Sequence, residues 1–261
     1  MQKISCGGRT VDVFLPEKST QAPVVIYGHG QALGLEQYRA TFEHLARKGV
    51  ATIFPTYDTG FFDQNWERMG RDYVKLSDCA LSKFAAELDR SQVVYSGHSK
   101  GAYVATLAAG IAGRDNLSPE PRALLVFAPA GAWPQWLAEI PVTTAVTVVH
   151  SDRDSIVSRD LSLTIYQSVK SERKQLIDFK SFIGVSSSDL LADHFWVLTK
   201  KSLFGGGPPS AFHYYGSWKW LVASALDPSR PIPFSDPYLY GERASDKGLL
   251  GLHDNFVRNW E

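Results

Sequence analysis

The feature that most restricts the fold of this chain is a series of short, nearly unbroken apolar runs rich in β-branched residues. Residues 23–27 read Pro-Val-Val-Ile-Tyr, and such a run is typical of a strand buried on both faces of a sheet. Stretches with helical periodicity separate most of these runs. The alternation predicts an α/β fold with a mostly parallel central sheet and helices on both of its faces. The expected strands are Thr10–Leu15, Pro23–Tyr27, Ala51–Phe54, Gln92–Tyr95, Ala123–Ala128, Thr144–Val149 and the weaker Lys174–Phe179.

Helical patterns occupy the intervals between the expected strands. The tail from about residue 227 is rich in Pro, Gly and Asp, so we expect irregular structure packed on the surface there. No linker or repeat divides the 261 residues, and α/β folds of this length are commonly single domains. We therefore expect one domain over residues 1–261. The expected helices are Leu35–Arg47, Trp66–Leu88, Gly101–Ala112, Arg159–Ser168 and Tyr214–Leu226.

Charge and hydropathy exclude two classes of partner. Lys and Arg together number 27, as do Asp and Glu, whereas a nucleic-acid-binding protein normally has a basic excess. No run of about 18 apolar residues occurs, so no helix is expected to span a membrane. The N-terminus lacks the long apolar stretch of a signal peptide. We therefore expect a soluble protein, either cytoplasmic or secreted with its leader already removed.

The chain has only two cysteines, Cys6 and Cys79, which lie far apart in the sequence. Enough apolar residues are present to build a core without disulfides or metals. We expect both cysteines to be free, partly buried thiols, and a disulfide between them is the less favoured alternative.

The pentapeptide Gly97–Gly101 reads Gly-His-Ser-Lys-Gly and fits the pattern G-x-S-x-G. It directly follows the expected strand Gln92–Tyr95 and precedes an Ala-rich helix, which is the context that a nucleophile elbow requires. Glycines two positions on either side leave room for a sharp turn, and the N–H groups that begin the helix face developing negative charge. We therefore expect Ser99 to be a nucleophile rather than the cap of an ordinary glycine-rich turn.

A second loop, Gly28–Gln31, follows the strand at 23–27 at its carboxyl end. In this architecture such a loop supplies one backbone donor for an oxyanion, and the residue after the nucleophile supplies the other. The expected donors are the backbone N–H groups of Gln31 and Lys100. We expect His29 to shape the loop, because no second metal ligand lies at a suitable spacing. No metal and no cofactor is expected.

A nucleophilic serine needs a histidine that accepts its proton, and that histidine needs a carboxylate that fixes its orientation. In this architecture the order along the chain is Ser, acid, His. We expect Asp154 to be the acid, because it directly precedes the residues that lead into the next helix, and Asp152 is the alternative. His194 is the expected base, because it lies on a loop after the strand Lys174–Phe179.

The other charged residues and histidines near these motifs are not expected to take part in catalysis. Lys100 and Arg153 could place positive charge at the mouth of the site, but we expect both side chains to be solvated at the surface. The remaining histidines have expected positions as follows: His98 beneath the elbow, His213 packed before the last helix, His44 and His150 on the surface or in loops, and His253 in the tail.

Taken together, these motifs resemble those of the α/β-hydrolases that include bacterial cutinases, polyester hydrolases and plant chlorophyllases. The resemblance implies a serine esterase with Ser99, Asp154 and His194 as its triad. The chain differs from these families at Lys100 and Gln31, and the natural ester stays undetermined. The similarity runs from about Val11 to Leu226 and is carried by the Gly28–Gln31 loop, the Gly97–Gly101 elbow, the Asp154 loop, and His194-Phe195 followed by Ser217–Leu221.

The expected substrate side is open and aromatic. Only about 14 residues separate Ala128 from Val142, where many lipases insert a cap, so no large cap domain is expected. Aromatic residues on the loops at the catalytic edge would form apolar walls for an ester. The expected substrate is a small-molecule, lipid-like or polymeric ester. The expected wall residues are Phe61, Phe62, Trp66, Trp133, Trp136 and Trp196.

The leading function is therefore a cofactor-independent carboxylic-ester hydrolase that acts through an acyl-enzyme. The same triad would also serve a peptidase or an acyltransferase. A dehalogenase is disfavoured because it needs an aspartate nucleophile where this chain has Ser99. The alternative from another class is a non-catalytic ligand-binding relative, and the presence of all three triad candidates argues against it.

Overall fold

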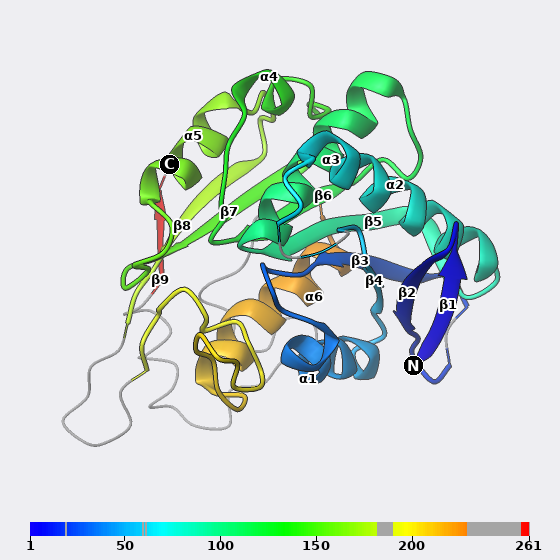
Figure 1. Ribbon diagram of the computed structural model, residues 1–261, viewed down its shortest axis with the longest axis horizontal. Coiled ribbons are helices and arrows are strands. Elements are labelled where there is room, and N and C mark those ends of the chain that lie inside the picture. Colours follow the sequence, from blue (N-terminus) through cyan, green and yellow to red (C-terminus); the bar gives the residue numbers. More distant parts are fainter. Residues whose placement is uncertain (19, 59, 61, 182–189, 229–256, 261) are drawn as a thin grey trace.

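A mixed sheet forms the centre of the computed structural model, which describes residues 1–18, 20–58, 60, 62–181, 190–228 and 257–260 (Figure 1). Within these residues the strand order is β1-β2-β4-β3-β5-β6-β7-β8-β9. The strands from β4 to β8 in this order are parallel, whereas β1, β2 and β9 pair antiparallel at the two edges. The strands are β1 Gln2–Cys6, β2 Arg9–Phe14, β3 Ala22–Gly28, β4 Ala51–Pro55, β5 Leu88–His98, β6 Ala123–Phe127, β7 Ala145–Ser151, β8 Lys174–Phe179 and β9 Val257–Trp260.

Helices cover both faces of the sheet, with α1 and α6 on one face and α2, α3, α4 and α5 on the other (Figure 1). Successive side chains of a strand point to opposite faces. In β3, Val24 and Ile26 belong to the core under α2 and α3, whereas Val25 and Tyr27 belong to the core under α1 and α6. This arrangement confirms the predicted α/β fold. The helices are α1 Leu35–Arg47, α2 Trp66–Lys83, α3 Lys100–Asp115, α4 Pro134–Leu137, α5 Arg159–Ser168, the π-helix η1 His213–Ser217 and α6 Trp218–Leu226.

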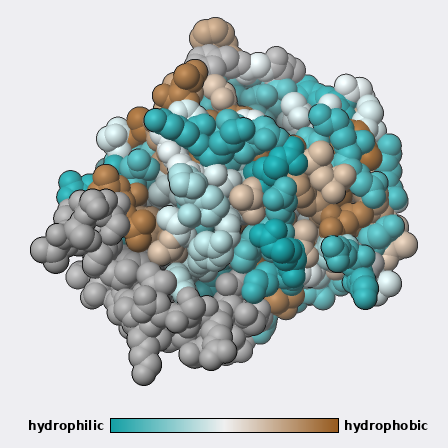
Figure 2. Space-filling view, turned by 90° about the horizontal axis from the view of Figure 1, so that it is seen from below, coloured by the Kyte–Doolittle hydropathy of each residue, from teal (hydrophilic) through white to brown (hydrophobic). Residues whose placement is uncertain are grey.

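The surface on the side of α1 and α6 is mostly hydrophilic where it is described, with hydrophobic residues in separate patches (Figure 2). Among the described residues, every helix is too short or too polar to cross a lipid bilayer.

Three of the predicted helices differ from those observed. The helix expected over Gly101–Ala112 is longer and spans Lys100–Asp115 as α3. The helix expected over Trp66–Leu88 ends at Lys83, because the chain turns after it and Leu88 already pairs with Ala22 of β3. The last helix is divided into η1 and α6, since Gly216 has non-helical dihedral angles (φ −111°, ψ −105°). By contrast, α1 and α5 have the bounds that the sequence pattern predicts.

The expectation of two free thiols is wrong, because Cys6 and Cys79 form a disulfide. A hairpin that the sequence analysis did not identify brings them together: β1 and β2 are joined by Gly7 and Gly8, both with positive φ, as a tight two-residue turn requires. The end of β1 then lies against α2, and the two Cα atoms are 6.1 Å apart, which is within the usual range for a disulfide. A separation of 73 residues left no local signal for this pairing.

Two expectations concerned the loops and the tail. The tail was expected to be irregular throughout, but Val257–Trp260 forms β9, which pairs antiparallel with β8. His253 lies outside the described residues. Between β6 and β7 the chain forms only the four-residue helix α4, so no cap domain is inserted at that position.

Candidate active site

Ser99 occupies the sharp turn between β5 and α3 (β5 ends at His98, and α3 begins at Lys100). Its dihedral angles are φ 56° and ψ −121°, a conformation that is costly for a residue with a side chain and is kept at functional sites. The backbone N–H of Ser99 donates to the carbonyl of Phe127 at 3.0 Å. This bond ties the turn to the neighbouring strand β6.

The glycines of the elbow are required by close packing. A Cβ atom on Gly101 would lie 2.1 Å from the carbonyl oxygen of Gly28, and one on Gly97 would lie 2.5 Å from the carbonyl of Gly101. The start of α3 therefore approaches the end of β3 at a distance that excludes any side chain. As a result, the Gly28–Gln31 loop lies beside the N-terminus of α3, as the sequence predicts.

His194 connects Ser99 to an aspartate. Its Nε2 lies 2.9 Å from Ser99 Oγ, and its Nδ1 lies 2.8 Å from Asp154 Oδ2. The carboxylate can only accept, so Nδ1 carries a proton and Nε2 of the neutral ring accepts from the serine hydroxyl. The His194 and Asp154 side chains are 3% and 0% exposed. The structure thus brings together the three residues that the sequence singled out.

Asp154, and not Asp152, contacts the imidazole. The other Asp154 oxygen accepts from the backbone N–H groups of Ile156 and Val157, both at 2.9 Å. Burial by itself raises the pKa of this carboxyl, but the hydrogen bonds from His194 and these two amides outweigh it, so its pKa lies below the ordinary value. Asp152 instead accepts from the backbone and hydroxyl of Ser181.

A buried chain of hydrogen bonds joins the Gly28–Gln31 loop to the loop of His194. Gly30 N–H donates to the Tyr38 hydroxyl, which is 3.0 Å from His98 Nδ1, while His98 Nε2 is 2.8 Å from the carbonyl of His194. The carbonyl only accepts, so Nε2 carries the proton and Nδ1 accepts from Tyr38. Burial lowers the pKa of His98 to about 3, which keeps the ring neutral and this directionality fixed.

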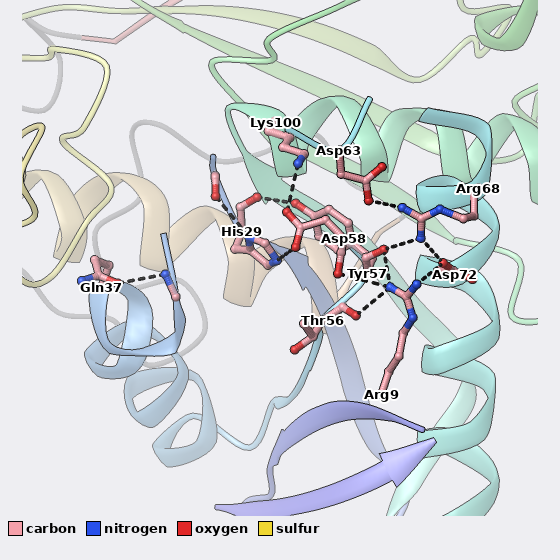
Figure 3. Close-up of polar contacts among 12 residues, drawn as sticks. Arg9, His29, Gln37, Thr56, Tyr57, Asp58, Asp63, Arg68, Asp72 and Lys100 are labelled. Atoms are coloured by element: carbon pink, nitrogen blue, oxygen red, sulfur yellow. Dashed lines mark hydrogen bonds and ion pairs between the residues drawn. The ribbon is translucent and has the colours of Figure 1, made fainter. Parts of the chain in front are cut away.

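The expectation of a solvated Lys100 is wrong. Its side chain is 3% exposed and its Nζ lies 2.9 Å from Asp58 Oδ2, on the loop after β4 (Figure 3). The other carboxylate oxygen is 3.9 Å from His29 Nε2. Burial lowers the pKa of His29. Arg153, by contrast, is exposed as expected.

The predicted wall residues divide into two groups. Trp66 and Trp133 contact the ring of Tyr103, with centroids 5.0 and 6.0 Å away, and Trp133 is 38% exposed. Tyr103 lies one helical turn after Ser99 and donates its N–H to the Ser99 carbonyl at 3.1 Å. Tyr103 was not among the residues expected near the site, although its spacing of four residues from Ser99 places it on the same face of a helix. Phe62 is exposed, and Phe61 lies outside the described residues.

Two of the proposed wall residues are core residues instead. Trp196 is buried against Phe179, with ring centroids 4.3 Å apart, and its indole N–H donates to Ser151 Oγ at 2.7 Å. Trp136 packs on α3, with the guanidinium of Arg114 4.1 Å from its ring centroid. Trp136 lies in α4 and Trp196 follows the loop after β8, and the sequence carried no information about the direction of either ring.

The other histidines among the described residues are buried. His44, expected at the surface, stacks on Trp218 with centroids 4.3 Å apart, because α1 packs against α6. His150 is buried at the end of β7, which corrects its expected position too. His213 is buried as expected, and burial lowers its pKa to about 4. Within the described part of the chain, no three His, Cys, Asp or Glu side chains gather as they would around a metal ion.

Comparisons with known proteins find likeness in structure alone. No family model and no curated protein matches the chain. Est1E from Butyrivibrio proteoclasticus with ferulic acid bound is 19% identical (TM-score 0.55; 69% of this chain, 89% of that one). Carboxyl esterase 2 from Tuber melanosporum is 15% identical (TM-score 0.57; 69% and 75%). Esterase 2 from Thermogutta terrifontis, phosphorylated by paraoxon, is 16% identical (TM-score 0.58; 77% and 85%). From this likeness and the sheet described above, we conclude that the chain has the α/β-hydrolase fold.

Proposed function

We propose that the protein is a serine hydrolase that cleaves a carboxylic ester through an acyl-enzyme. The observation that carries this proposal is the continuous hydrogen-bonded line from Ser99 Oγ through His194 to Asp154. A nucleophile, a base and an orienting acid in this geometry are what acyl transfer requires.

The geometry supports the following sequence of steps. Ser99 Oγ attacks the ester carbonyl while His194 Nε2 accepts its proton, and Asp154 stabilises the resulting imidazolium. The backbone N–H groups of Gln31 and Lys100 donate to the oxyanion of the tetrahedral intermediate. His194 then gives the proton to the leaving alcohol, and the acyl group stays on Ser99. Water activated by His194 hydrolyses this acyl-enzyme in the second half of the cycle.

The structural neighbours are consistent with this chemistry. One of them is an esterase phosphorylated by paraoxon, and another is described with ferulic acid bound. In the present chain, the half-buried Trp66 and the exposed Trp133 form an aromatic surface over the buried ring of Tyr103, which lies one helical turn from Ser99. We assign the apolar acyl or alcohol part of the ester to this surface.

The test combines a covalent probe with a series of nitrophenyl esters. A fluorophosphonate should label the wild type on Ser99 and leave Ser99→Ala unlabelled. Ester turnover should fall by about 10⁴-fold or more in Ser99→Ala, and His194→Ala should match it within about tenfold, because the two residues act as one unit. Absence of labelling in a folded wild type would favour the non-catalytic ligand-binding alternative. Faster transfer to an added alcohol than to water would identify an acyltransferase.

A further inference from the structure

A buried cluster of His29, Asp58 and Lys100 lies beside the proposed oxyanion hole (Figure 3). Lys100 contributes one of the proposed oxyanion donors with its backbone, and His29 is two residues before the other, Gln31. Asp58 forms an ion pair with Lys100, with its Oδ2 2.9 Å from Lys100 Nζ, whereas its Oδ1 lies 3.9 Å from His29 Nε2, beyond hydrogen-bond distance. One carboxylate therefore lies between the two segments that would bind the oxyanion.

The cluster needs an explanation because burying a lysine is costly. An ammonium that leaves water is tolerated when a carboxylate compensates it, and removal of one partner leaves an uncompensated charge. The Lys100 side chain is almost fully buried, and Asp58 is the partner with which it pairs in the described structure. A methionine or leucine would fill a buried site after the nucleophile without this requirement. The ion pair therefore has a role that an apolar side chain would not supply.

Asp58 is itself held firmly. Arg9 donates to the carbonyls of Tyr57 at 2.8 Å and Asp58 at 3.3 Å, and Arg68 donates to the Tyr57 carbonyl at 3.3 Å. Both arginines also contact Asp72 of α2 (Figure 3). The loop after β4 is thus fastened to β2 and α2, so the Asp58 carboxylate has a fixed position.

The same loop also fixes the other donor segment. The Tyr57 hydroxyl donates to the carbonyl of His29, and the two rings stack with centroids 4.5 Å apart and an angle of 16°. Consecutive residues of one loop therefore reach the two halves of the proposed oxyanion hole: Tyr57 contacts the His29 backbone, and Asp58 contacts the Lys100 side chain.

We infer that Asp58 is a positioning residue. Its ion pair with Lys100, together with the hydrogen bond from the neighbouring Tyr57 to the His29 carbonyl, sets the spacing between the backbone amides of Gln31 and Lys100. Donors of an oxyanion hole must keep their geometry within a fraction of an ångström. Without Asp58, the Lys100 ammonium would turn toward water and draw the first turn of α3 with it. The inference rests on the proposed function, since the spacing matters only if an oxyanion forms there.

The experiment compares Asp58→Asn, Lys100→Met and the double variant with the wild type. For a nitrophenyl ester, we expect kcat to fall by about 10- to 100-fold in each single variant, less than the 10²- to 10³-fold that loss of a whole donor causes, with KM changed by less than about threefold. A trifluoromethyl ketone forms a tetrahedral oxyanion on the serine. Its affinity for each variant should fall by about the same factor as kcat. The kcat of the double variant should be at least as high as that of the less active single variant, because the double variant leaves no unpaired buried charge.

Glu67→Gln is the control. Glu67 lies in the first turn of α2, where its carboxylate, 48% exposed, pairs with Arg71 of the same helix. Loss of an exposed pair should keep kcat within about twofold of wild type. The acidic limb of the pH–rate profile should be unchanged in every variant, because the contact of His194 with Asp154 is untouched. Asp58→Glu should recover part of the lost kcat, which a merely structural role would not require.

The outcomes separate this inference from the proposed function. If the wild type is labelled by the phosphonate and turns over esters, but Asp58→Asn behaves like Glu67→Gln, the positioning role is wrong and the esterase proposal stands. A rise in KM at constant kcat would also overturn it, by assigning Lys100 to substrate binding. If the wild type itself is neither labelled nor active, the proposed function has failed. Where Asp58→Asn does not fold, the double variant and Asp58→Glu carry the same test.

Discussion

The two sides of Ser99 are built differently. On the base side, the loops after β7 and β8 each contribute one side chain, Asp154 and His194, and two hydrogen bonds complete the line to the serine. On the oxyanion side, the proposed donors are backbone groups, whose positions depend on many contacts from β2, the loop after β4, α1 and α2. The difference teaches that a side-chain function can be assigned residue by residue, whereas a backbone function depends on the whole surrounding network.

The largest effect that tests this contrast concerns the choice of acid on the base side. Asp154→Asn should lower kcat by about 10³- to 10⁴-fold, because an amide no longer holds the imidazole in the reactive tautomer. The kcat of Asp152→Asn should stay within about threefold of wild type, since the Asp152 carboxylate accepts hydrogen bonds from Ser181 and not from His194 in the described structure. Steady-state kinetics on one nitrophenyl ester decides between them. If Asp152→Asn proves the more damaging change, the base side is assigned wrongly.

The next effect is on stability and concerns the disulfide that joins β1 to α2, on the oxyanion side of the molecule. Replacing Cys6 and Cys79 by alanine should lower the free energy of unfolding by about 2–4 kcal/mol, the usual contribution of a disulfide that closes a long loop. Ester turnover by the folded protein should change by less than about twofold, because Arg9 still contacts the loop after β4. Urea denaturation and kinetics at low temperature measure the two quantities.

A smaller effect should reach both sides together. Tyr38→Phe removes the hydroxyl between Gly30 and His98. The change leaves the buried N–H of Gly30 and the buried Nδ1 of His98 without this partner and should lower stability by about 1–3 kcal/mol. Because the chain of bonds ends at the carbonyl of His194, kcat should also fall by about 10-fold through misplacement of both sides. A variant with unchanged kcat would show that the two sides are independent. Tyr27→Phe is the control, since Tyr27 packs beside Tyr38 without belonging to this chain of hydrogen bonds.

The last prediction concerns how the free energy of unfolding depends on pH, to which His98 and Asp154 contribute in different pH ranges. The folded-state pKa of His98 is about 3, well below that of an unfolded histidine, so only the unfolded state binds a proton as pH falls below about 6.5. This histidine should therefore cost up to about 1.4 kcal/mol of stability per pH unit below that value. Asp154, whose pKa is lowered, stabilises the fold above its unfolded pKa and loses that contribution only at still lower pH. Denaturant titrations between pH 7 and 5 give the free energy of unfolding of wild type and His98→Gln. Its slope against pH should differ between the two proteins by the amount expected for about one bound proton.

Features with a local pattern could be predicted from the sequence, whereas features that depend on contacts between distant residues could not. Strand and helix patterns predicted seven of the strands and the bounds of α1 and α5, because burial on both faces of a sheet leaves a local record in hydrophobicity. The hairpin of β1 and β2 escaped notice, although the Gly7-Gly8 pair between two short strands is a known hairpin signal. Trp136 and Trp196 were assigned to the wrong environment, because a loop position says nothing about which way a ring points.

By itself, the sequence determined the alternation of strands and helices, the elbow around Ser99 and the order of the triad candidates, because each depends on residue types at short spacing. Only the tertiary structure decided that Cys6 bonds to Cys79, that Asp154 rather than Asp152 meets His194, and that Lys100 is buried on Asp58. These pairings join residues 40 or more positions apart. They form because packing of the sheet and helices brings distant loops together, and no local pattern records that meeting.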